Sequence, residues 1–222
     1  MKLPEFSADE IIRQKCPEAR LGILLCKVKV DDAPPGLTGF IGEELQKIQE
    51  KLTIGDIHGI GPLAEARTAY KALGKDPSRY RPSAEALLRR VVKGKGLYPV
   101  SNVVDALNLV SVSTGYSIGG YDLEKIKGPV RFGRGEENEP YEAIGRGTLN
   151  IQGLPLLRDD AGAFGSPTSD SPRTMVTPAT TGFLAVFFDF GENENLEMAM
   201  GLMTEWLERF ASRELVVKRL IG

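Results

Sequence analysis

Histidine is nearly absent from this chain, since His58 is the only one among 222 residues. A Ser-His-Asp or Cys-His catalytic apparatus would have to use this residue, and a zinc site would need it together with cysteine or acidic partners. Its surroundings, T-I-G-D-I-H-G-I-G-P-L, indicate a glycine-punctuated linker before a helix. We therefore interpret His58 as a loop histidine bonded to backbone and exclude conventional triads and zinc hydrolases. Neither a metal nor a cofactor is expected.

Cysteine, net charge and long apolar runs are also scarce. Cys16 and Cys26 are the only two cysteines, which excludes a disulfide framework and fits a reducing cytoplasm. The net charge of −2 argues against a sequence-independent coat on nucleic acid, so DNA is not an expected partner, but it leaves room for a local basic face. No run approaches the roughly eighteen apolar residues of a membrane span. Since the N-terminal M-K-L-P-E-F-S-A-D-E also lacks the pattern of a signal peptide, we expect a soluble cytoplasmic protein with no membrane partner.

Hydrophobic spacing predicts the order of the secondary structure. Helical spacing predicts helices over residues 41–51, 62–73, 83–93 (capped by Ser83), 100–112 and 194–212. Apolar runs and alternation predict strands over residues 21–30, 130–132, 143–151, 153–157, 182–190 and 215–221. Helices lead, strands follow and a helix comes near the end. This order predicts an α+β fold.

The most informative segment is residues 159–174, D-D-A-G-A-F-G-S-P-T-S-D-S-P-R-T, which reads as a polar, turn-rich loop. Such loops tend to carry binding and catalytic residues when strands hold their ends. One interpretation is that Arg173 pairs with Asp170 and leaves the hydroxyls of Ser171 and Thr174 facing a cleft. The other is a surface turn stapled by an Asp170–Arg173 pair. Spacing alone leaves both open.

A second polar cluster is S-N-V-V-D-A-L-N at residues 101–108. On a helix Ser101, Asp105 and Asn108 share one face, because residues three and four apart are neighbours. Either this stripe lines a cleft, or Ser101 or Asn102 caps the helix and Asp105 supports its first turn. We expect the helix and the 159–174 loop to line one common cleft.

A third cluster is basic: R-Y-R-P-S-A-E-A-L-L-R-R-V-V-K-G-K at residues 79–95 has six basic residues and one acid. This composition is typical of a face that contacts phosphates. The alternative is a solvated helix face with Lys and Arg near its C-terminal end. The glycines of G-K-G, G-R-G-E and G-R-G-T match no phosphate-loop spacing, so nucleotide hydrolysis is not predicted.

Taken together, these motifs resemble a known family. S-N-V-V-D-A-L-N-L, T-G-Y-S-I-G-G-Y-D-L-E-K-I-K-G and L-P-L-L-R-D-D-A-G-A-F-G resemble, in that order, the tRNA-editing domain of the phenylalanyl-tRNA synthetase β subunit, its paired third and fourth modules. Freestanding relatives of that domain are more similar, because they share the block D-P-S-R-Y-R-P-S-x-E-x-L-x-R-R-V-x-x-G-K-G at residues 76–96 and D-S-x-R-T at residues 170–174.

The resemblance implies a fold and a division of the chain. The fold is a layered sandwich of mostly antiparallel sheets with packed helices. Residues 66–190 would form the core like the editing domain, within a single compact domain. Residues 1–65 would be an N-terminal extension packed on it, and residues 191–222 a C-terminal helix and edge strand.

The resemblance also implies an activity, the hydrolysis of mischarged aminoacyl-tRNA in trans. One branch of the freestanding relatives is associated with removing the arginine analogue canavanine from arginine tRNA. This chain places Gly119 or Gly120 where the synthetase domain has a pocket histidine, so the resemblance does not extend to specificity for aromatic amino acids. An aminoacyl ester is already activated, so the protein needs only to bind it, orient a water and stabilise the oxyanion.

The resemblance assigns roles to the three clusters. The catalytic group comprises Asp170 for water or amine binding, Ser171 and Thr174 for hydrogen bonds near the carbonyl, and Arg173 for orienting Asp170. The amino-acid pocket comprises Asn102, Asp105, Gly162 and Gly165. The contacts to the phosphates at the tRNA acceptor end comprise Arg79, Arg81, Arg89, Arg90 and Lys93.

Two functions of other classes stay open beside the deacylase. One is a module that binds tRNA or a small molecule without turnover. The other is a small-molecule hydrolase that kept the fold and lost RNA, which predicts that the basic residues are scattered in space.

Overall fold

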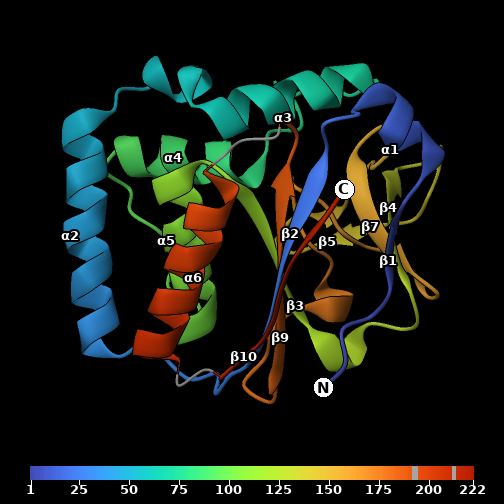
Figure 1. The fold of residues 1–222 in the computed structure, drawn as a ribbon. Coiled ribbons are helices and arrows are strands. Elements are labelled where there is room, and N and C mark those ends of the chain that lie inside the picture. Colours follow the sequence, from blue (N-terminus) through green and yellow to red (C-terminus); the bar gives the residue numbers. More distant parts are fainter. Residues whose placement is uncertain (192–194, 212–213) are drawn as a thin grey trace.

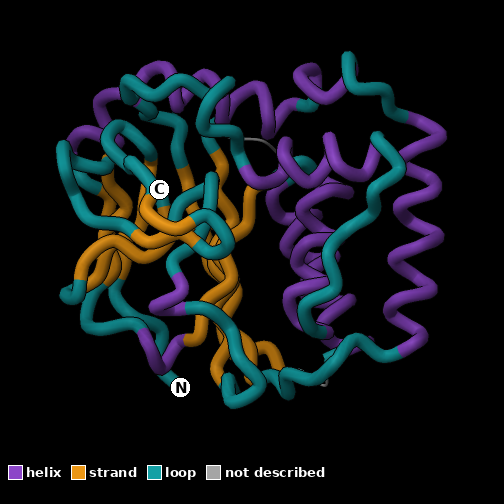
Figure 2. The backbone as a smooth tube through the Cα atoms, turned by 180° about the vertical axis from the view of Figure 1, so that it is seen from behind, coloured by secondary structure: helices purple, strands orange, loops and turns teal. Residues whose placement is uncertain are grey.

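Three layers make up the computed structural model, which describes residues 1–191, 195–211 and 214–222, apart from the side chains of residues 215 and 216. The helices at residues 35–51, 83–92, 102–114 and 196–210 form one outer layer, a four-stranded sheet lies in the middle, and a second four-stranded sheet forms the other outer layer (Figure 1). Seen from behind, most of the helices again gather on one side and the strands on the other, and further helices run along the top of the molecule (Figure 2).

The bounds of the described elements are as follows. The helices are α1 (Glu10–Lys15), α2 (Pro35–Lys51), α3 (Gly61–Ala72), α4 (Ser83–Val92), α5 (Asn102–Thr114) and α6 (Leu196–Phe210), with short 3-10 turns η1 (Asp56–Gly59), η2 (Leu123–Lys125) and η3 (Pro172–Thr174). The strands are β1 (Phe6–Ala8), β2 (Arg20–Lys27), β3 (Ser117–Asp122), β4 (Val130–Arg134), β5 (Glu142–Ala143), β6 (Gly147–Thr148), β7 (Pro155–Asp159), β8 (Gly162–Gly165), β9 (Gly182–Asp189) and β10 (Glu214–Ile221).

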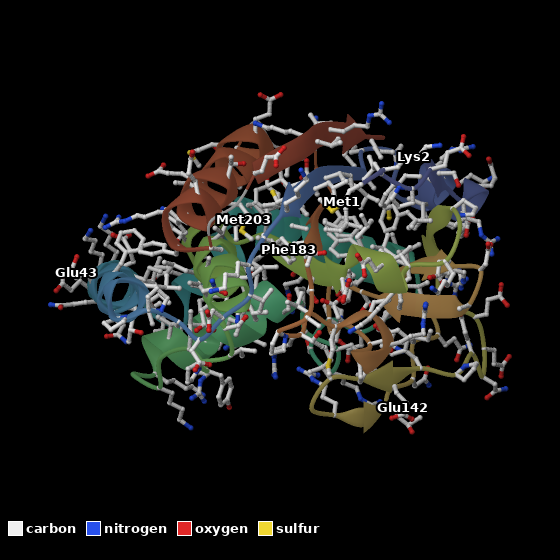
Figure 3. The ribbon with its side chains drawn as sticks, turned by 90° about the horizontal axis from the view of Figure 1, so that it is seen from below. Met1, Lys2, Glu43, Glu142, Phe183 and Met203 are labelled. Carbon is white, nitrogen blue, oxygen red and sulfur yellow. The ribbon has the colours of Figure 1, made fainter. Side chains whose placement is uncertain are left out.

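The middle sheet has the order β10-β2-β9-β3 and is antiparallel throughout. Strand β9 is buried along its whole length because both of its faces are covered. Its residues 183, 185 and 187 pack in the core shared with the helices, and residues 184, 186 and 188 in the core shared with the second sheet. Figure 3 shows Phe183 between the layers and Glu43 of α2 at the outer margin of the helices. This burial explains why residues 182–188 form a continuous apolar run.

The second sheet has the order β1-β4-β7-β8, and only the β1–β4 pair is parallel. Phe132, Leu157 and Phe164 point toward the middle sheet and pack in the core between the two sheets. The predicted α+β fold with mostly antiparallel sheets and packed helices is therefore confirmed.

Helix α5 lies at the centre of the helical layer and contacts α2, α4 and α6. Ser101 caps it, since its Oγ accepts a hydrogen bond from the backbone N–H of Val104 at 3.3 Å. Gly115 ends it with a φ of 81°, in the left-handed region where a glycine is favoured. No helix in the described parts of the chain is both long and apolar enough to cross a membrane.

Several predicted elements need correction. The strand predicted at 143–151 is instead the short β5–β6 hairpin, because Gly145 and Gly147 have positive φ and turn the chain within it. The loop predicted at 159–174 contains β8 and η3, since Phe164 is buried and draws residues 162–165 into the second sheet.

Helix ends also differ from the prediction. Ser83 is the first residue of α4, and Pro82 takes the cap position. Helix α2 begins six residues before the predicted start, at a proline that favours the first turn. Helix α6 covers residues 196–210, while residues 194 and 212 of the prediction lie outside the described residues.

Candidate functional site

A cavity of about 390 Å³ lies between α4 and α5 on one side and the β5–β6 hairpin with the chain before η3 on the other. Its apolar wall includes Leu87, Val104, Leu107, Ile118 and Val176. Its polar side chains include Asn108 on α5 and, on the chain segment that faces it, Ser166, Thr168, Ser169 and Asp170. The expected common cleft between the 101–108 helix and the 159–174 segment is therefore present. A wider hollow of about 570 Å³ lies near Lys2, Glu5 and Arg219, away from the three polar clusters of the sequence.

Asp170 is the one acidic side chain among the described residues that line this cavity. Its Oδ1 accepts a hydrogen bond from the Tyr121 hydroxyl at 2.7 Å, and its Oδ2 accepts a longer one from the Gly120 N–H at 3.4 Å. Burial raises the pKa of Asp170 to about 7, although both hydrogen bonds act to lower it. At neutral pH the carboxyl group can therefore both accept and return a proton.

Tyr121 reaches Asp170 through a slot made by two glycines. A Cβ atom on Gly119 or on Gly165 would overlap the Tyr121 hydroxyl. The Tyr121 ring also packs edge-on against Phe164, with ring centroids 5.0 Å apart. Gly165, which the resemblance assigned to substrate binding, thus leaves room for the Tyr121 hydroxyl.

Hydrogen bonds hold the chain that carries Asp170. The Ser166 Oγ accepts from the backbone N–H groups of Thr168 and Ser169, both at 3.2 Å. The Tyr141 hydroxyl donates to the Ser169 carbonyl at 2.7 Å, and the Ile144 N–H donates to the Asp170 carbonyl at 2.9 Å. The carboxyl group is therefore positioned before any ligand binds.

The predicted pairing of Arg173 with Asp170 is wrong. Arg173 binds the buried Asp159 with two hydrogen bonds, of 3.0 and 2.8 Å, and also donates to the Gly162 carbonyl at 3.0 Å. The reason is that Asp159 ends β7 where the chain turns into β8, and a buried carboxylate there needs a cation. Gly162 has a φ of 110° in that turn and is absent from the cavity wall.

Ser171 and Thr174 also lie outside the cavity wall. Ser171 is buried, and its Oγ accepts from the Arg173 N–H at 3.3 Å, which caps η3. Thr174 is fully buried, and its Oγ1 has no hydrogen-bond partner among the described residues. The structure thus does not bring either hydroxyl to the place expected for a substrate carbonyl.

The polar residues at the start of α5 are structural. Asp105 accepts from the Val100 N–H at 2.9 Å, and burial raises the pKa of its carboxyl group. Asn102 donates to the carbonyls of Lys29 and Phe210 and accepts from the Asp31 N–H. Neither Asn102 nor Asp105, which the resemblance assigned to the amino-acid pocket, is part of the cavity wall, because both fix the chain before the helix.

A basic groove of about 450 Å³ adjoins the cavity. The two hollows share Ala86, Leu87, Tyr98 and Arg146, so they form one continuous surface. The basic residues of the groove are Arg81, Arg89, Arg90, Lys93, Lys95 and Arg146. Four of the five residues predicted to contact phosphates lie here, whereas Arg79 is exposed outside the groove. Since the cluster is gathered in space, the prediction of scattered basic residues does not hold.

Arg146 was missed by the sequence analysis. It lies in the turn of the β5–β6 hairpin, far along the chain from the basic stretch, and lines both hollows. Figure 3 shows this hairpin, marked by Glu142, at the margin of the molecule. The only signal in the sequence was the G-R-G-T pattern around it, which was compared with phosphate-loop spacings and matched none.

Glu85 anchors the arginines of the groove. Its side chain is fully buried and accepts from Arg67 and Arg89, both at 2.8 Å, while the Arg81 Nε lies 3.7 Å away. His58 Nε2 lies 3.3 Å from the same carboxylate and 2.8 Å from the Arg89 guanidinium. Burial alone would raise the pKa of Glu85, but the hydrogen bonds from Arg89 and Arg67 outweigh it and hold the pKa below its usual value.

His58 thus contacts side chains, and the interpretation as a histidine bonded to backbone is corrected. Within the described residues, no group of His, Cys, Asp and Glu is arranged to hold a metal ion.

The chain is similar to known proteins in both sequence and fold. The family model described as the B3/4 domain matches residues 65–214. Among solved structures, the chain is similar to an N-terminal fragment of the phenylalanyl-tRNA synthetase β subunit from Pyrococcus horikoshii, with 16% identity and a TM-score of 0.49. The match covers 95% of this chain and 50% of that fragment, so the chain spans about half of its length. No curated protein sequence matches the chain.

Proposed function

Since the chain belongs to the B3/4 domain family, we propose that it is a deacylase that hydrolyses the ester of aminoacyl-tRNA. The observation that carries this proposal is the continuity between the cavity that holds Asp170 and the basic groove, which share Tyr98 and Arg146. A charged tRNA end presents phosphates and an aminoacyl ester next to each other. The surface offers cations and a carboxyl group in the same order.

The groove suits the RNA part of such a substrate. Its lysines and arginines can neutralise phosphates, and such contacts position an RNA without reading its sequence. The cavity suits the aminoacyl part, because its volume of about 390 Å³ is in the range of small-ligand pockets and its walls are mostly apolar.

Asp170 is the proposed general base. Its carboxylate accepts a proton from a water as the water oxygen attacks the ester carbonyl carbon. The proton then passes to the ribose oxygen that leaves, so the products are the free amino acid and the uncharged tRNA. The hydrogen bond from Tyr121 fixes the orientation of the carboxylate. Asn108, which lines the opposite wall and has no hydrogen-bond partner among the described residues, can donate to the developing oxyanion.

The proposal is tested with a panel of correctly and wrongly charged tRNAs incubated with the purified protein. We expect release of the amino acid from one class of mischarged tRNA well above the spontaneous rate. Binding of tRNA without release from any member of the panel would instead identify a binding module. Neither binding nor release would reject both.

Removing the exposed lysines of the groove should flatten the salt dependence of tRNA binding. Lys93 and Lys95 are both exposed there, so a Lys93→Ala/Lys95→Ala double variant should fold normally. Each lost phosphate contact lowers the slope of log K against log salt by about 0.7–0.9, so we expect a reduction of about 1.5. The matched control is Lys47→Ala/Lys51→Ala on α2, which lies outside the groove and should keep the slope. An unchanged slope in the groove variant would show that its lysines are only solvated.

A further inference from the structure

Tyr98 stands at the junction of the cavity and the basic groove and lines both. Its side chain is 59% exposed, which is unusual for an aromatic residue in a folded chain. Of the seven large apolar or aromatic side chains that are exposed in the described part of the chain, four line this cavity: Tyr98, Val100, Ile144 and Met175. Apolar surface gathered in this way marks a place where a ligand binds.

Arg90 supports one face of the Tyr98 ring. Its guanidinium carbon lies 3.7 Å from the ring centroid, and its Nη1 donates to the Tyr98 hydroxyl at 2.9 Å. A cation over an aromatic face stabilises the pair and fixes the plane of the ring. Arg90 covers one face of the Tyr98 ring, so the opposite face is the exposed one. A second flat group can stack on that face.

The backbone after α4 places this ring. The Gly94 N–H donates to the Val91 carbonyl at 2.8 Å and the Lys95 N–H to the Arg90 carbonyl at 3.1 Å, with Gly94 at a φ of 73°. This pattern is a Schellman motif, which ends the helix and turns the chain back along it. The turn brings Tyr98 back into contact with Arg90, which lies eight residues earlier. A proline follows Tyr98 and favours an extended backbone at Tyr98.

We propose that Tyr98, stacked on Arg90, is a platform for the 3′-terminal nucleobase of the RNA. The inference rests on the proposed function. Along the surface the order is the cations of the groove, the Tyr98 ring, and then the cavity with Asp170. Along the end of a charged tRNA the order is phosphate, terminal nucleoside and amino acid. The ring therefore lies where the base of the terminal nucleoside arrives. Stacking on an aromatic ring accepts any base, and at this site it would set the distance from the ester to Asp170.

The test compares two oligonucleotides that differ only in the last base. One is the trinucleotide CCA, and the other has an abasic sugar in place of the final nucleoside. Their affinities are measured by calorimetry for the wild type, Tyr98→Leu and Tyr98→Phe, with Met198→Leu on α6 as the control for an exposed apolar side chain outside the cavity. Circular dichroism confirms that each variant is folded.

We expect the wild type and Met198→Leu to bind CCA about 5- to 150-fold more tightly than the abasic form, the range for one stacked base. Tyr98→Phe should keep most of this preference, and Tyr98→Leu should lose it. Equal weakening of both oligonucleotides by Tyr98→Leu, or no preference in the wild type, would overturn the platform. Adenosine monophosphate bound as tightly as CCA would also overturn it, because the ligand would then be a free nucleotide.

The trinucleotide carries no amino acid, so this test is independent of ester hydrolysis. A base preference that depends on Tyr98, found in a protein that deacylates no tRNA, would keep the platform and reject the deacylase. Deacylation of a tRNA by a protein that shows no base preference would support the deacylase and reject the platform.

Discussion

Asp170→Asn is expected to slow deacylation by roughly ten- to a thousandfold, the range for losing a positioned acid-base group. The same substitution should raise the thermal midpoint at pH 8. An asparagine can still accept the hydrogen bond from Tyr121, but it carries no charge in a cavity that disfavours one. A group that costs stability and supports activity is typical of a functional site.

The raised pKa of Asp170 makes the effect of this substitution on stability depend on pH. The pKa of Asp170 is about 7 in the folded protein, above the value of about 3.9 for an aspartate in an unfolded chain. Between these values the folded state binds more protons, so this carboxyl group makes the free energy of unfolding fall as pH rises. The stability advantage of Asp170→Asn should therefore be absent near pH 4, grow up to about pH 7, and stay constant above it.

Melting curves and turnover on the same samples check both results. The control is Asp32→Asn, which changes an exposed aspartate in the same way and should alter neither quantity. Full activity in a stable Asp170→Asn protein would contradict the assignment. A lower midpoint at pH 8 would show that the carboxylate stabilises the fold.

Glu85→Gln should cause the largest loss of stability. The substitution leaves Arg67 and Arg89 without their buried anion, and breaking such a pair costs about 3–5 kcal/mol. For a chain of this size the thermal midpoint should fall by roughly 6–20 °C. Binding of tRNA should weaken too, because Arg81 and Arg89 lose the group that holds them at the groove.

The contribution of Glu85 to stability changes with pH in the opposite direction to that of Asp170. Hydrogen bonds from Arg89 and Arg67 hold the pKa of Glu85 below its usual value, so its contribution is present above the unfolded pKa and lost as pH falls through the folded one. The difference between wild type and variant should be full at pH 7 and shrink below about pH 4. Glu44→Gln, which breaks an exposed pair with Lys47, should change the midpoint little. An equal effect of the two substitutions would contradict the anchoring of the groove by Glu85.

The sequence predicted the α+β class and the strongest elements because their patterns are local. Strand β9 is apolar from Gly182 to Phe188, and α5 is a buried helix with a serine cap and a glycine at its end. The β5–β6 hairpin was misread as a longer strand, since the positive φ of its two glycines outweighs the alternation around them.

The site was predicted only in part, because its remaining geometry depends on long-range packing. Asp170 could be proposed, because the polar, turn-rich composition of residues 159–174 is visible in the sequence without knowledge of what packs around it. Tyr121 could not, because its ring reads as core and its contact with Asp170 exists only through the slot of Gly119 and Gly165.

Two assignments differ from the contacts in the structure. Arg173 was paired with the nearest acid in the sequence, while the turn between β7 and β8 gives it the buried Asp159. The resemblance placed Asn102 and Asp105 in the pocket, but their hydrogen bonds go to the chain before α5.

The most direct test of the central claim is a crystal structure with a non-hydrolysable analogue, an amino acid joined by an amide to the 3′ position of adenosine. We expect the amino acid in the cavity and an ordered water between its carbonyl carbon and Asp170. That water should lie about 2.6–3.2 Å from a carboxyl oxygen. An analogue seated elsewhere on the protein, or one in the cavity with no water or polar group of the ligand within reach of Asp170, would contradict the account.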